Sequence, residues 1–272
     1  MEACANHWKK SHAGTRQLSR TLGCSQSTIN RRLRKLDYVL KRPRKDPHNL
    51  TQEQARRRID VCTQLLQNPL DDRFWRRIVT CDEKWIFFNN PVNKRQWVPR
   101  GQAPQPSLRK DRFGKKVMIS VWWNFEGVLL FEMFPEGQAV NSEIYCNLLD
   151  QVYEVLKRKY PALTNRKNVL LQHDNAPCHR SRMTQDKIKD LDDIEVLLHP
   201  AYSPDIAPSD YSLFRSMTHF LNGQRFDNNE DVKNACQTFF ASKTKDWYRL
   251  QISHLAYKWS KVIEHNGLYF DD

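Results

Sequence analysis

The feature that most constrains the fold is a pair of apolar runs, each followed by a carboxylate. Residues 168–171 read Asn-Val-Leu-Leu, and Asp174 follows shortly before Pro177 interrupts the pattern. This is typical of a buried strand that delivers an acid to the loop at its C-terminal edge. A second apolar run, residues 194–198, leads into a proline-rich loop and then to Asp210, where the sequence predicts the start of a helix.

A third acid, Asp82, lies far upstream between two β-rich stretches, residues 77–80 and 85–88. We expect Asp82 and Asp174 at strand ends and Asp210 in the first turn of a helix, where the dipole favours a negative group. Three carboxylates on separate elements, without a nucleophilic Ser or Cys arrangement beside them, indicate a site for divalent cations. Gathered acids repel one another unless cations neutralise them. Taken singly, each acid has an ordinary alternative as a strand-end charge, a turn residue or a helix cap.

The order of the predicted elements favours an α/β fold with a mixed sheet. Residues 89–115 between the first two strands are polar, basic and rich in proline, which indicates a long excursion. No run of about 18 apolar residues predicts a membrane span. The expected elements are β-rich stretches at 77–80 and 85–88, strands in 116–123, 127–133, 168–174 and 194–198, and helices over 142–160, 180–191 and from Asp210 onward.

Residues 15–36 predict a helix-turn-helix. Gly23 separates two short amphipathic helices, and Ser25 is placed to cap the second of them. An ordinary helical hairpin with a solvated basic face is the alternative. The outward side chains of the second helix that suit base edges and phosphates are Gln26, Ser27, Thr28, Asn30, Arg31 and Arg34.

Positive charge is concentrated in the N-terminal quarter. The chain has a formal net charge of +13, and residues 1–69 contain fifteen Lys and Arg against five Asp and Glu. This imbalance favours a polyanionic partner. Lys41, Arg42 and Arg44 lie in a proline-containing stretch that suits a phosphate-backbone contact, a nuclear import signal or a solvated tether, and the sequence does not separate these. We expect residues 1–40 to form the helix-turn-helix unit and 41–69 a basic linker and helix.

Three blocks of the sequence resemble the catalytic blocks of mariner-type transposases. They are residues 79–85, Val-Thr-Cys-Asp-Glu-Lys-Trp, residues 173–179, His-Asp-Asn-Ala-Pro-Cys-His, and residues 202–214, which begin Tyr-Ser-Pro-Asp. The likeness extends from about Thr15 to Phe270. It implies an RNase H-like catalytic domain over 70–272, in which 89–115 is the insertion that family members use to clamp a partner subunit.

The resemblance also implies a chemistry. The catalytic, metal-binding triad falls on Asp82, Asp174 and Asp210, with two Mg²⁺ or Mn²⁺ ions as cofactors. Members of the family act on double-stranded DNA: they cut at terminal inverted repeats and join the freed ends to a TA target. A homodimer and a nuclear location are expected, and no membrane partner. Asn175 and His179 are candidates to orient Asp174 or contact the scissile phosphate, with loop stabilisation as the alternative.

Two departures from the family pattern bear on function. Thirty-five residues separate Asp174 from Asp210, one more than is usual in the family, and we expect the extra residue to fit within 191–194. Residues 15–36 match the second of the family's two helix-turn-helix units, and the first has no counterpart in this sequence. The alternative function is therefore a non-catalytic, transposase-derived DNA-binding protein.

Overall fold

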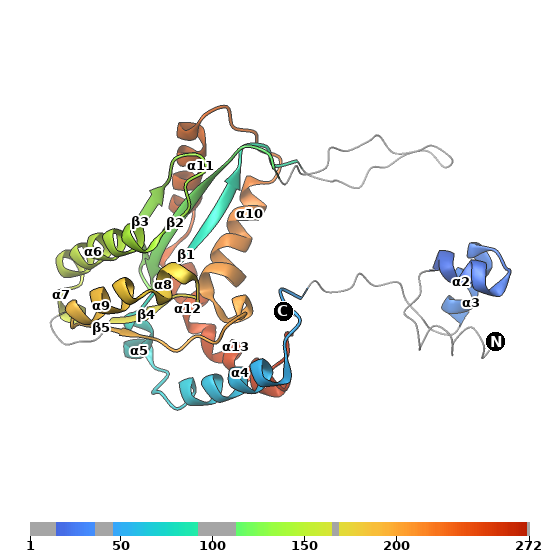
Figure 1. Cartoon of the computed structure of the whole chain (residues 1–272), viewed down its shortest axis with the longest axis horizontal. Coiled ribbons are helices and arrows are strands. Elements are labelled where there is room, and N and C mark those ends of the chain that lie inside the picture. Colours follow the sequence, from blue (N-terminus) through green and yellow to red (C-terminus); the bar gives the residue numbers. More distant parts are fainter. Residues whose placement is uncertain (1–14, 36–45, 92–112, 165–168, 271–272) are drawn as a thin grey trace. The chain divides into compact units, whose positions relative to one another are not determined.

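A computed structural model of the 272-residue chain describes residues 15–35, 46–91, 113–164 and 169–270. The chain divides into two units, Met1–Lys45 and Asp46–Asp272, which are described separately (Figure 1). The helix expected within the linker segment 41–69 belongs to the larger unit. None of the helices in the described part of the chain is long and apolar enough to cross a bilayer.

The smaller unit contains the predicted helix-turn-helix. Gly23 separates the helices with a φ of 61°, a left-handed conformation that glycine adopts without strain. The backbone N–H of Thr28 donates to the Ser25 hydroxyl at 3.2 Å, so Ser25 caps the second helix as expected. Leu18 and Ile29 are buried between the helices. The helices are α2 (Thr15–Leu22) and α3 (Gln26–Lys35).

The larger unit is built on one five-stranded mixed sheet in the order β3-β2-β1-β4-β5. The β1–β2 and β2–β3 pairs are antiparallel, whereas β1–β4 and β4–β5 are parallel. The predicted mixed α/β sheet is therefore confirmed. The strands are β1 (Ile78–Phe87), β2 (Lys116–Asn124), β3 (Gly127–Met133), β4 (Val169–Gln172) and β5 (Ile194–Val196).

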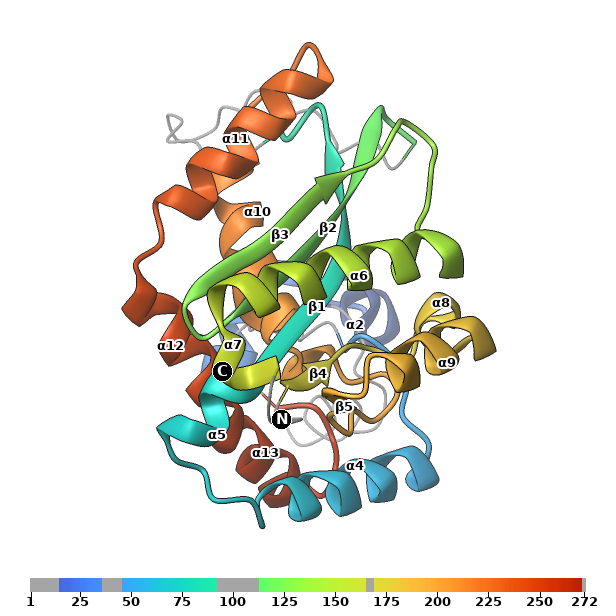
Figure 2. The ribbon, with the colours of Figure 1, turned by 90° about the vertical axis from the view of Figure 1, so that its left-hand side faces the viewer.

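Both faces of the sheet are covered, as two neighbouring residues of β2 show. Successive side chains of a strand point to opposite faces, and the adjacent Trp122 and Trp123 are both fully buried. Trp122 packs in the core beneath α6, whereas Trp123 packs with residues of the C-terminal helices. Figure 2 shows α6 across one face of the sheet, with α10 behind the other. The sheet is thus the middle layer of three.

The first three sheet strands are followed by helices that alternate with strands, as the sequence predicts. The helix over 142–160 is confirmed, with Asn141 as its N-cap. The helix expected over 180–191 is confirmed as α9, and a separate short helix, α8, precedes it across the extended backbone of Ser181. These elements are α6 (Ser142–Lys159), α7 (Pro161–Thr164), α8 (Pro177–Arg180) and α9 (Arg182–Asp190).

The C-terminal part is more helical than the sequence analysis specified. After β5 come short turns and then four α-helices, which bury apolar residues such as Phe239, Ile252 and Trp259. The remaining elements are α4 (Gln52–Leu65), α5 (Asp72–Arg77), η1 (Pro204–Ile206), η2 (Ser209–Phe214), α10 (Arg215–Leu221), α11 (Asn229–Ala241), α12 (Lys245–Ser253) and α13 (Leu255–Glu264).

A buried arginine joins α4 to the loop that precedes the third acid. Arg58 has no exposed side-chain surface, and its guanidinium makes a two-pronged ion pair with Asp205. It also donates to the Ser203 hydroxyl at 2.7 Å and to the Gly267 carbonyl at 2.8 Å. Gly267 must remain a glycine, because a Cβ there would lie 2.1 Å from the Ala55 carbonyl oxygen. Arg58 therefore connects α4, the 203–205 loop and the C-terminal segment.

We predict that Arg58→Met lowers the free energy of unfolding of the larger unit by about 3–5 kcal/mol. The reason is that Asp205 is left as a largely buried carboxylate without its partner. The measurement is equilibrium urea unfolding of the full chain followed by tryptophan fluorescence. Arg56→Met, on the exposed face of the same helix, is the matched control and changes stability by less than about 0.5 kcal/mol. Equal losses in both variants would contradict the role of this ion pair.

Candidate active site

The pairing of two parallel strands places Asp82 beside Asp174. Thr80 of β1 is level with Gln172 of β4, and each acid lies two residues further along its own chain. The expectation that Asp82 ends a strand is wrong, because β1 continues to Phe87. It continues because β2 pairs with it over its whole length, with Asp82 opposite Val121. Asp82 is nevertheless level with Asp174, two residues beyond the end of β4.

Asp210 lies in the first turn of η2, a single turn of π-helix that lies against β1. Such turns are frequent at functional sites. Its neighbours fix it in place: the Ser209 hydroxyl accepts from Trp123 Nε1 at 3.0 Å. The Tyr211 hydroxyl donates to the Gln251 carbonyl at 2.6 Å. The expected position of Asp210 at a helix start is confirmed, and hydrogen bonds to β2 and α12 hold it there.

The three acids converge closely enough to perturb one another. Burial, together with the charges of Asp210, Glu83 and Asp174, raises the pKa of Asp82 well above its usual value. Burial raises the pKa of Asp210 to about 6, and Asp174 adds to this while Lys84 opposes it. Buried acids that lie near one another raise one another's pKa in this way.

Asp174 differs because a histidine supports it. Burial alone would raise the pKa of Asp174, but a hydrogen bond from His179 and one from the Ala176 N–H outweigh burial and lower it. The His179 Nδ1 lies 2.7 Å from Asp174 Oδ1, and the Nε2 lies 3.4 Å from Glu83 Oε2, close enough to pair but not aligned as a hydrogen bond. Burial disfavours the imidazolium, but these two carboxylates outweigh it and raise the pKa of His179 to about 12. The ring is therefore charged and fixed between both acids.

The other candidate supporting residue, Asn175, bonds to the loop that follows β5. Its side-chain amide donates to the His199 carbonyl at 3.0 Å. Burial lowers the pKa of His199 to about 4 and that of His173 to about 3, so both rings are neutral at physiological pH. His173 in turn shares a 2.7 Å hydrogen bond with the Tyr145 hydroxyl. Of the two candidate supporting residues, His179 contacts the Asp174 carboxylate, whereas Asn175 bonds to the His199 backbone.

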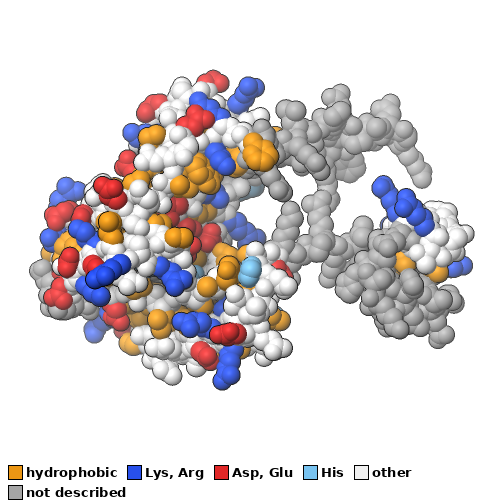
Figure 3. Space-filling view, in the orientation of Figure 1, with side chains coloured by type: hydrophobic (Ala, Val, Ile, Leu, Met, Phe, Trp, Pro, Cys, Tyr) orange, Lys and Arg blue, Asp and Glu red, His pale blue; other side chains and the backbone are white. Residues whose placement is uncertain are grey.

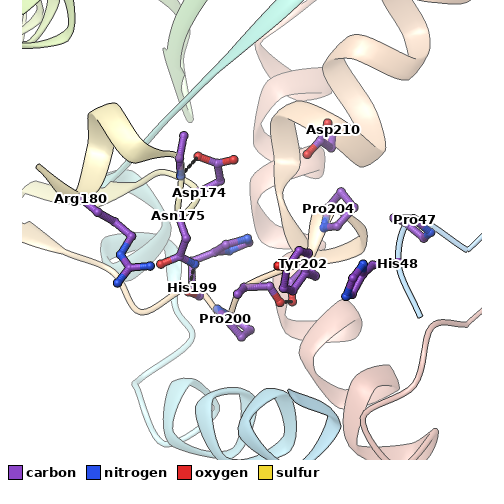
Figure 4. A pocket seen from close by; sticks show the side chains of 13 residues that line it. Pro47, His48, Asp174, Asn175, Arg180, His199, Pro200, Tyr202, Pro204 and Asp210 are labelled. Carbon is purple, nitrogen blue, oxygen red and sulfur yellow. Dashed lines mark hydrogen bonds between the residues drawn. The ribbon is translucent and has the colours of Figure 1, made fainter. Parts of the chain in front are cut away.

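Asp174 and Asp210 face one cavity of about 540 Å³ from opposite sides (Figure 4). Arg180 and His199 lie on the Asp174 side, and Tyr202 and His48 lie on the other. The rings of His48 and Tyr202 are stacked, with centroids 3.9 Å apart. A cavity of this size, lined by apolar rings and a few polar groups, is typical of a binding site for part of a small or extended ligand.

The donor set fits a hard divalent cation. All three candidate ligands are carboxylates, which Mg²⁺ and Mn²⁺ prefer, and the raised pKa values of Asp82 and Asp210 show repulsion that a cation would relieve. Within the described ranges, no group of three or more His, Cys, Asp or Glu side chains is placed so that it could hold a metal ion. The fit to a cation therefore rests on the chemistry of the three carboxylates and on their effect on one another's pKa.

The candidate DNA-contacting residues of the smaller unit lie on α3. Gln26, Ser27, Asn30, Arg31 and Arg34 are exposed, and Thr28 is partly exposed. The Gln26 amide is bonded to the Thr15 hydroxyl at 2.9 Å, and the hydroxyls of Ser27 and Thr28 take part in the Ser25 cap. Asn30, Arg31 and Arg34 line a shallow hollow on α3 together with Ser27 and Lys35.

Charge is distributed differently over the two units. On the face shown in Figure 3, the described side chains of the smaller unit include Lys and Arg but no acid, whereas both signs are mixed over the larger unit. Lys41, Arg42 and Arg44 lie outside the described residues, as does most of the 89–115 excursion, so the structure does not address their expected roles.

Sequence reasoning missed two contributors to the site. One is Glu83, which pairs with His179 and accepts a hydrogen bond from the Ser120 hydroxyl at 2.9 Å. Arg58 was not singled out among three consecutive arginines. Its spacing of four from Cys62 and seven from Leu65 places it on the apolar stripe of α4, and that spacing was the available signal.

A five-stranded mixed sheet, with one acid on the central strand β1, a second just after the adjacent β4 and a third on the helical turn that follows β5, is typical of an RNase H-like catalytic domain. A family model described as "Transposase (partial DDE domain)" matches residues 87–166. The Mariner Mos1 transposase of Drosophila mauritiana is 41% identical over 257 residues, covering 94% of this chain and 74% of that protein. The human "Histone-lysine N-methyltransferase SETMAR" is 38% identical over 257 residues, and the chain spans 37% of its length.

Solved structures of the Mos1 transposase also resemble this chain. Mos1 paired-end complexes with Mn, with Mg and with the left transposon end match at TM-scores of 0.88, 0.86 and 0.88 and 40, 39 and 40% identity. They cover 98, 98 and 99% of this chain, and 79% of each solved chain. The Mos1 catalytic domain matches at 0.70 and 39% identity, over 83% of this chain and 99% of that one. The chain belongs to the mariner transposase family, and the expected RNase H-like fold is confirmed.

We predict that Asp82→Asn raises the melting temperature in EDTA at pH 7.5 by about 2–4 °C. Asp82 and Asp210 have pKa values raised above the unfolded value of 3.8. Such carboxyls favour folding while protonated and lose that contribution as pH rises through the folded pKa, which is about 6 for Asp210. The gain from the variant therefore shrinks towards pH 5.

The measurement is differential scanning fluorimetry of the full chain across pH, with EDTA or Mg²⁺. Mg²⁺ stabilises the wild type more than Asp82→Asn. Asp246→Asn, which removes an exposed carboxylate from α12, is the control and changes neither value. A lower melting temperature for Asp82→Asn in EDTA at pH 7.5 would contradict the account of repulsion among these acids.

We predict that His179→Gln weakens the apparent affinity for Mg²⁺ by roughly 10–100-fold, as is usual when a residue that orients a metal ligand is lost. The variant retains a side-chain donor but no longer bridges Glu83 and Asp174 as a fixed cation. The measurement is isothermal titration with Mn²⁺ or Mg²⁺ in the full chain. His219→Gln, on the exposed face of α10, is the control. Unchanged metal affinity in His179→Gln would exclude the positioning role.

Proposed function

We propose that this protein is a cut-and-paste DNA transposase, cleaving DNA at terminal inverted repeats and joining the freed ends to a TA target. The observation that supports the proposal is the placement of the acids: the β1–β4 register makes Asp82 level with Asp174, and Asp210 lies on η2, which packs against β1. Membership of the mariner family supports it, because the Mos1 enzyme is a transposase whose paired-end complexes were solved with Mn and with Mg.

In this proposal the three aspartates hold two Mg²⁺ or Mn²⁺ ions. Such a pair supplies an activated oxygen nucleophile and stabilises the charge on the attacking and leaving oxygens of a phosphodiester. His179 holds one oxygen of Asp174, which leaves the other free to face the cavity. The hydrogen bonds of Ser209 and Tyr211, on either side of Asp210, hold the backbone that carries the Asp210 carboxyl in place. The chain thus provides rigid, oxygen-only positions for the ions.

The cavity beside the acids suits a DNA strand. Asp174 and Asp210 lie on opposite walls, so a phosphodiester between them would meet both. Arg180 on the Asp174 side supplies a positive charge near the phosphate. In the smaller unit, Arg31 and Arg34 of α3 supply contacts to duplex DNA. We propose a homodimer acting on chromosomal DNA in the nucleus, by analogy with the paired-end assembly of the Mos1 protein.

We predict Mg²⁺-dependent nicking of supercoiled plasmid DNA by the purified chain. Asp174→Asn and Asp210→Asn each reduce the rate by more than the roughly 10–100-fold of an outer-shell change, because each removes a direct metal ligand. The measurement is the rate of conversion to open-circular DNA in Mg²⁺ or Mn²⁺, and Asp246→Asn is the matched control. Wild-type rates in Asp174→Asn would rule out the catalytic assignment.

A non-catalytic DNA-binding protein is the second candidate, and the basic α3 favours it independently of the acids. It requires duplex binding without metal-dependent cleavage by the wild type. Nicking that depends on Asp174 excludes it, whereas salt-sensitive binding with no nicking by the full chain supports it.

We predict that Arg31→Gln reduces the slope of log K against log salt for duplex binding by about 0.9, as expected for one lost phosphate contact. Arg32 is on the same helix but does not line the hollow formed by Asn30, Arg31 and Arg34. Arg32→Gln is therefore the control, and we expect no change of slope. The measurement is fluorescence anisotropy of a labelled duplex between low and moderate salt. Equal slopes for both variants and the wild type would show that α3 does not contact DNA as proposed.

A further inference from the structure

A second cavity, of about 490 Å³, lies beside the loop that carries Asp174. It shares Asp174, Asn175, Arg180 and His199 with the first cavity, so the two are neighbours across one loop. Its other walls come from α4, α9 and the end of β5. The proposed chemistry needs only the cavity that also contains Asp210, and the second cavity is therefore unexplained.

The floor of the second cavity is apolar and partly open to solvent. Val196 and Leu198 are 41% and 44% exposed, although both follow the pattern of a strand that should be covered. They lie on or just after β5, which is the edge strand of the sheet. Ile188 of α9 contributes a further apolar surface and is nearly buried. Exposed apolar groups within a lined cavity are typical of a binding surface.

Positive side chains from three different helices surround that floor. Arg57 comes from α4, Arg180 from α8 and Lys189 from α9. In the described part of the chain, no ion pair engages Arg57 or Arg180, and Lys189 has only a 3.7 Å contact with the exposed Asp186. Asp174 is the one carboxylate among the lining residues. Three cations with so little internal neutralisation favour an anionic occupant.

We propose that the second cavity binds an unpaired stretch of DNA strand adjoining the phosphodiester at the acids, with Arg57 and Lys189 each contacting a phosphate. Because Asp174 lines both cavities, a strand that passes from one to the other would run on directly from the proposed scissile phosphodiester. The apolar floor of the second cavity suits a sugar or a base. The volume admits a group of nucleotide size and not a double helix. The inference rests on the proposed function, because it is that function which brings a DNA strand to Asp174.

The test compares two double variants of the full chain. Arg57→Gln with Lys189→Gln removes two cations of the cavity, whereas Arg56→Gln with Arg182→Gln removes two exposed cations from the same helices, α4 and α9, that do not line it. The readout is fluorescence anisotropy of a labelled oligothymidylate, without divalent metal, over a range of KCl concentrations. A labelled duplex of equal length is measured in parallel.

Single-strand binding loses about 0.7 in the log–log salt slope for each phosphate contact removed. The cavity variant is therefore expected to lose about 1.4 in slope, which corresponds to roughly 25-fold weaker binding at 0.1 M KCl. The control pair is expected to bind oligothymidylate like the wild type, and the duplex slope is unchanged in both. An unchanged slope in the cavity variant, an equal loss in the control, or an equal loss for the duplex would each overturn the proposal.

The outcome is separable from that of the proposed function. If wild-type protein nicks DNA with Mg²⁺ but the cavity variant keeps the full salt slope, the strand-binding cavity is wrong and the transposase activity stands. If the slope falls as expected but no nicking occurs, the cavity binds single-stranded DNA in a protein that does not cleave it. Matching circular dichroism spectra and melting temperatures of both double variants confirm that the exposed substitutions leave the fold intact.

Discussion

The parallel pairing of β1 with β4 is the constraint on which the candidate site depends. Its register makes Thr80 level with Gln172, so Asp82 and Asp174 emerge side by side, and a shift of one residue would turn an acid to the other face of the sheet. Trp122 and Trp123, buried on opposite faces of the neighbouring strand, oppose any such shift. The apolar packing of the sheet therefore fixes the position of the charges.

The third acid is brought to that edge by separate interactions, and their strength reflects the repulsion it must tolerate. Hydrogen bonds of Ser209 and Tyr211 fasten η2 to β2 and α12. Upstream, the buried Arg58 holds Asp205 and so fixes the loop that enters η2. Two carboxyls with raised pKa values would otherwise move apart. These interactions hold the acids close together, and the repulsion between them favours the binding of a cation.

Much of this arrangement could be predicted from the sequence, because the signals are local. The apolar run that precedes Asp174 and the helical spacing over 142–160 both act over a few residues, and the structure confirms both elements. Asp82 was misplaced because a long antiparallel partner, β2, extends its strand. The partnership of Glu83 with His179 and that of Arg58 with Asp205 join residues far apart in the chain, which no local pattern specifies.

The account's central claim is that Asp82, Asp174 and Asp210 converge to bind divalent cations. Anomalous diffraction from crystals of the full chain grown with Mn²⁺ tests it most directly. The account predicts anomalous density at the edge of the sheet, with oxygens of all three aspartates as ligands, and its loss in crystals of Asp82→Asn. Mn²⁺ bound elsewhere, or an aspartate of the three that turns away from the ion in the wild type, would contradict it.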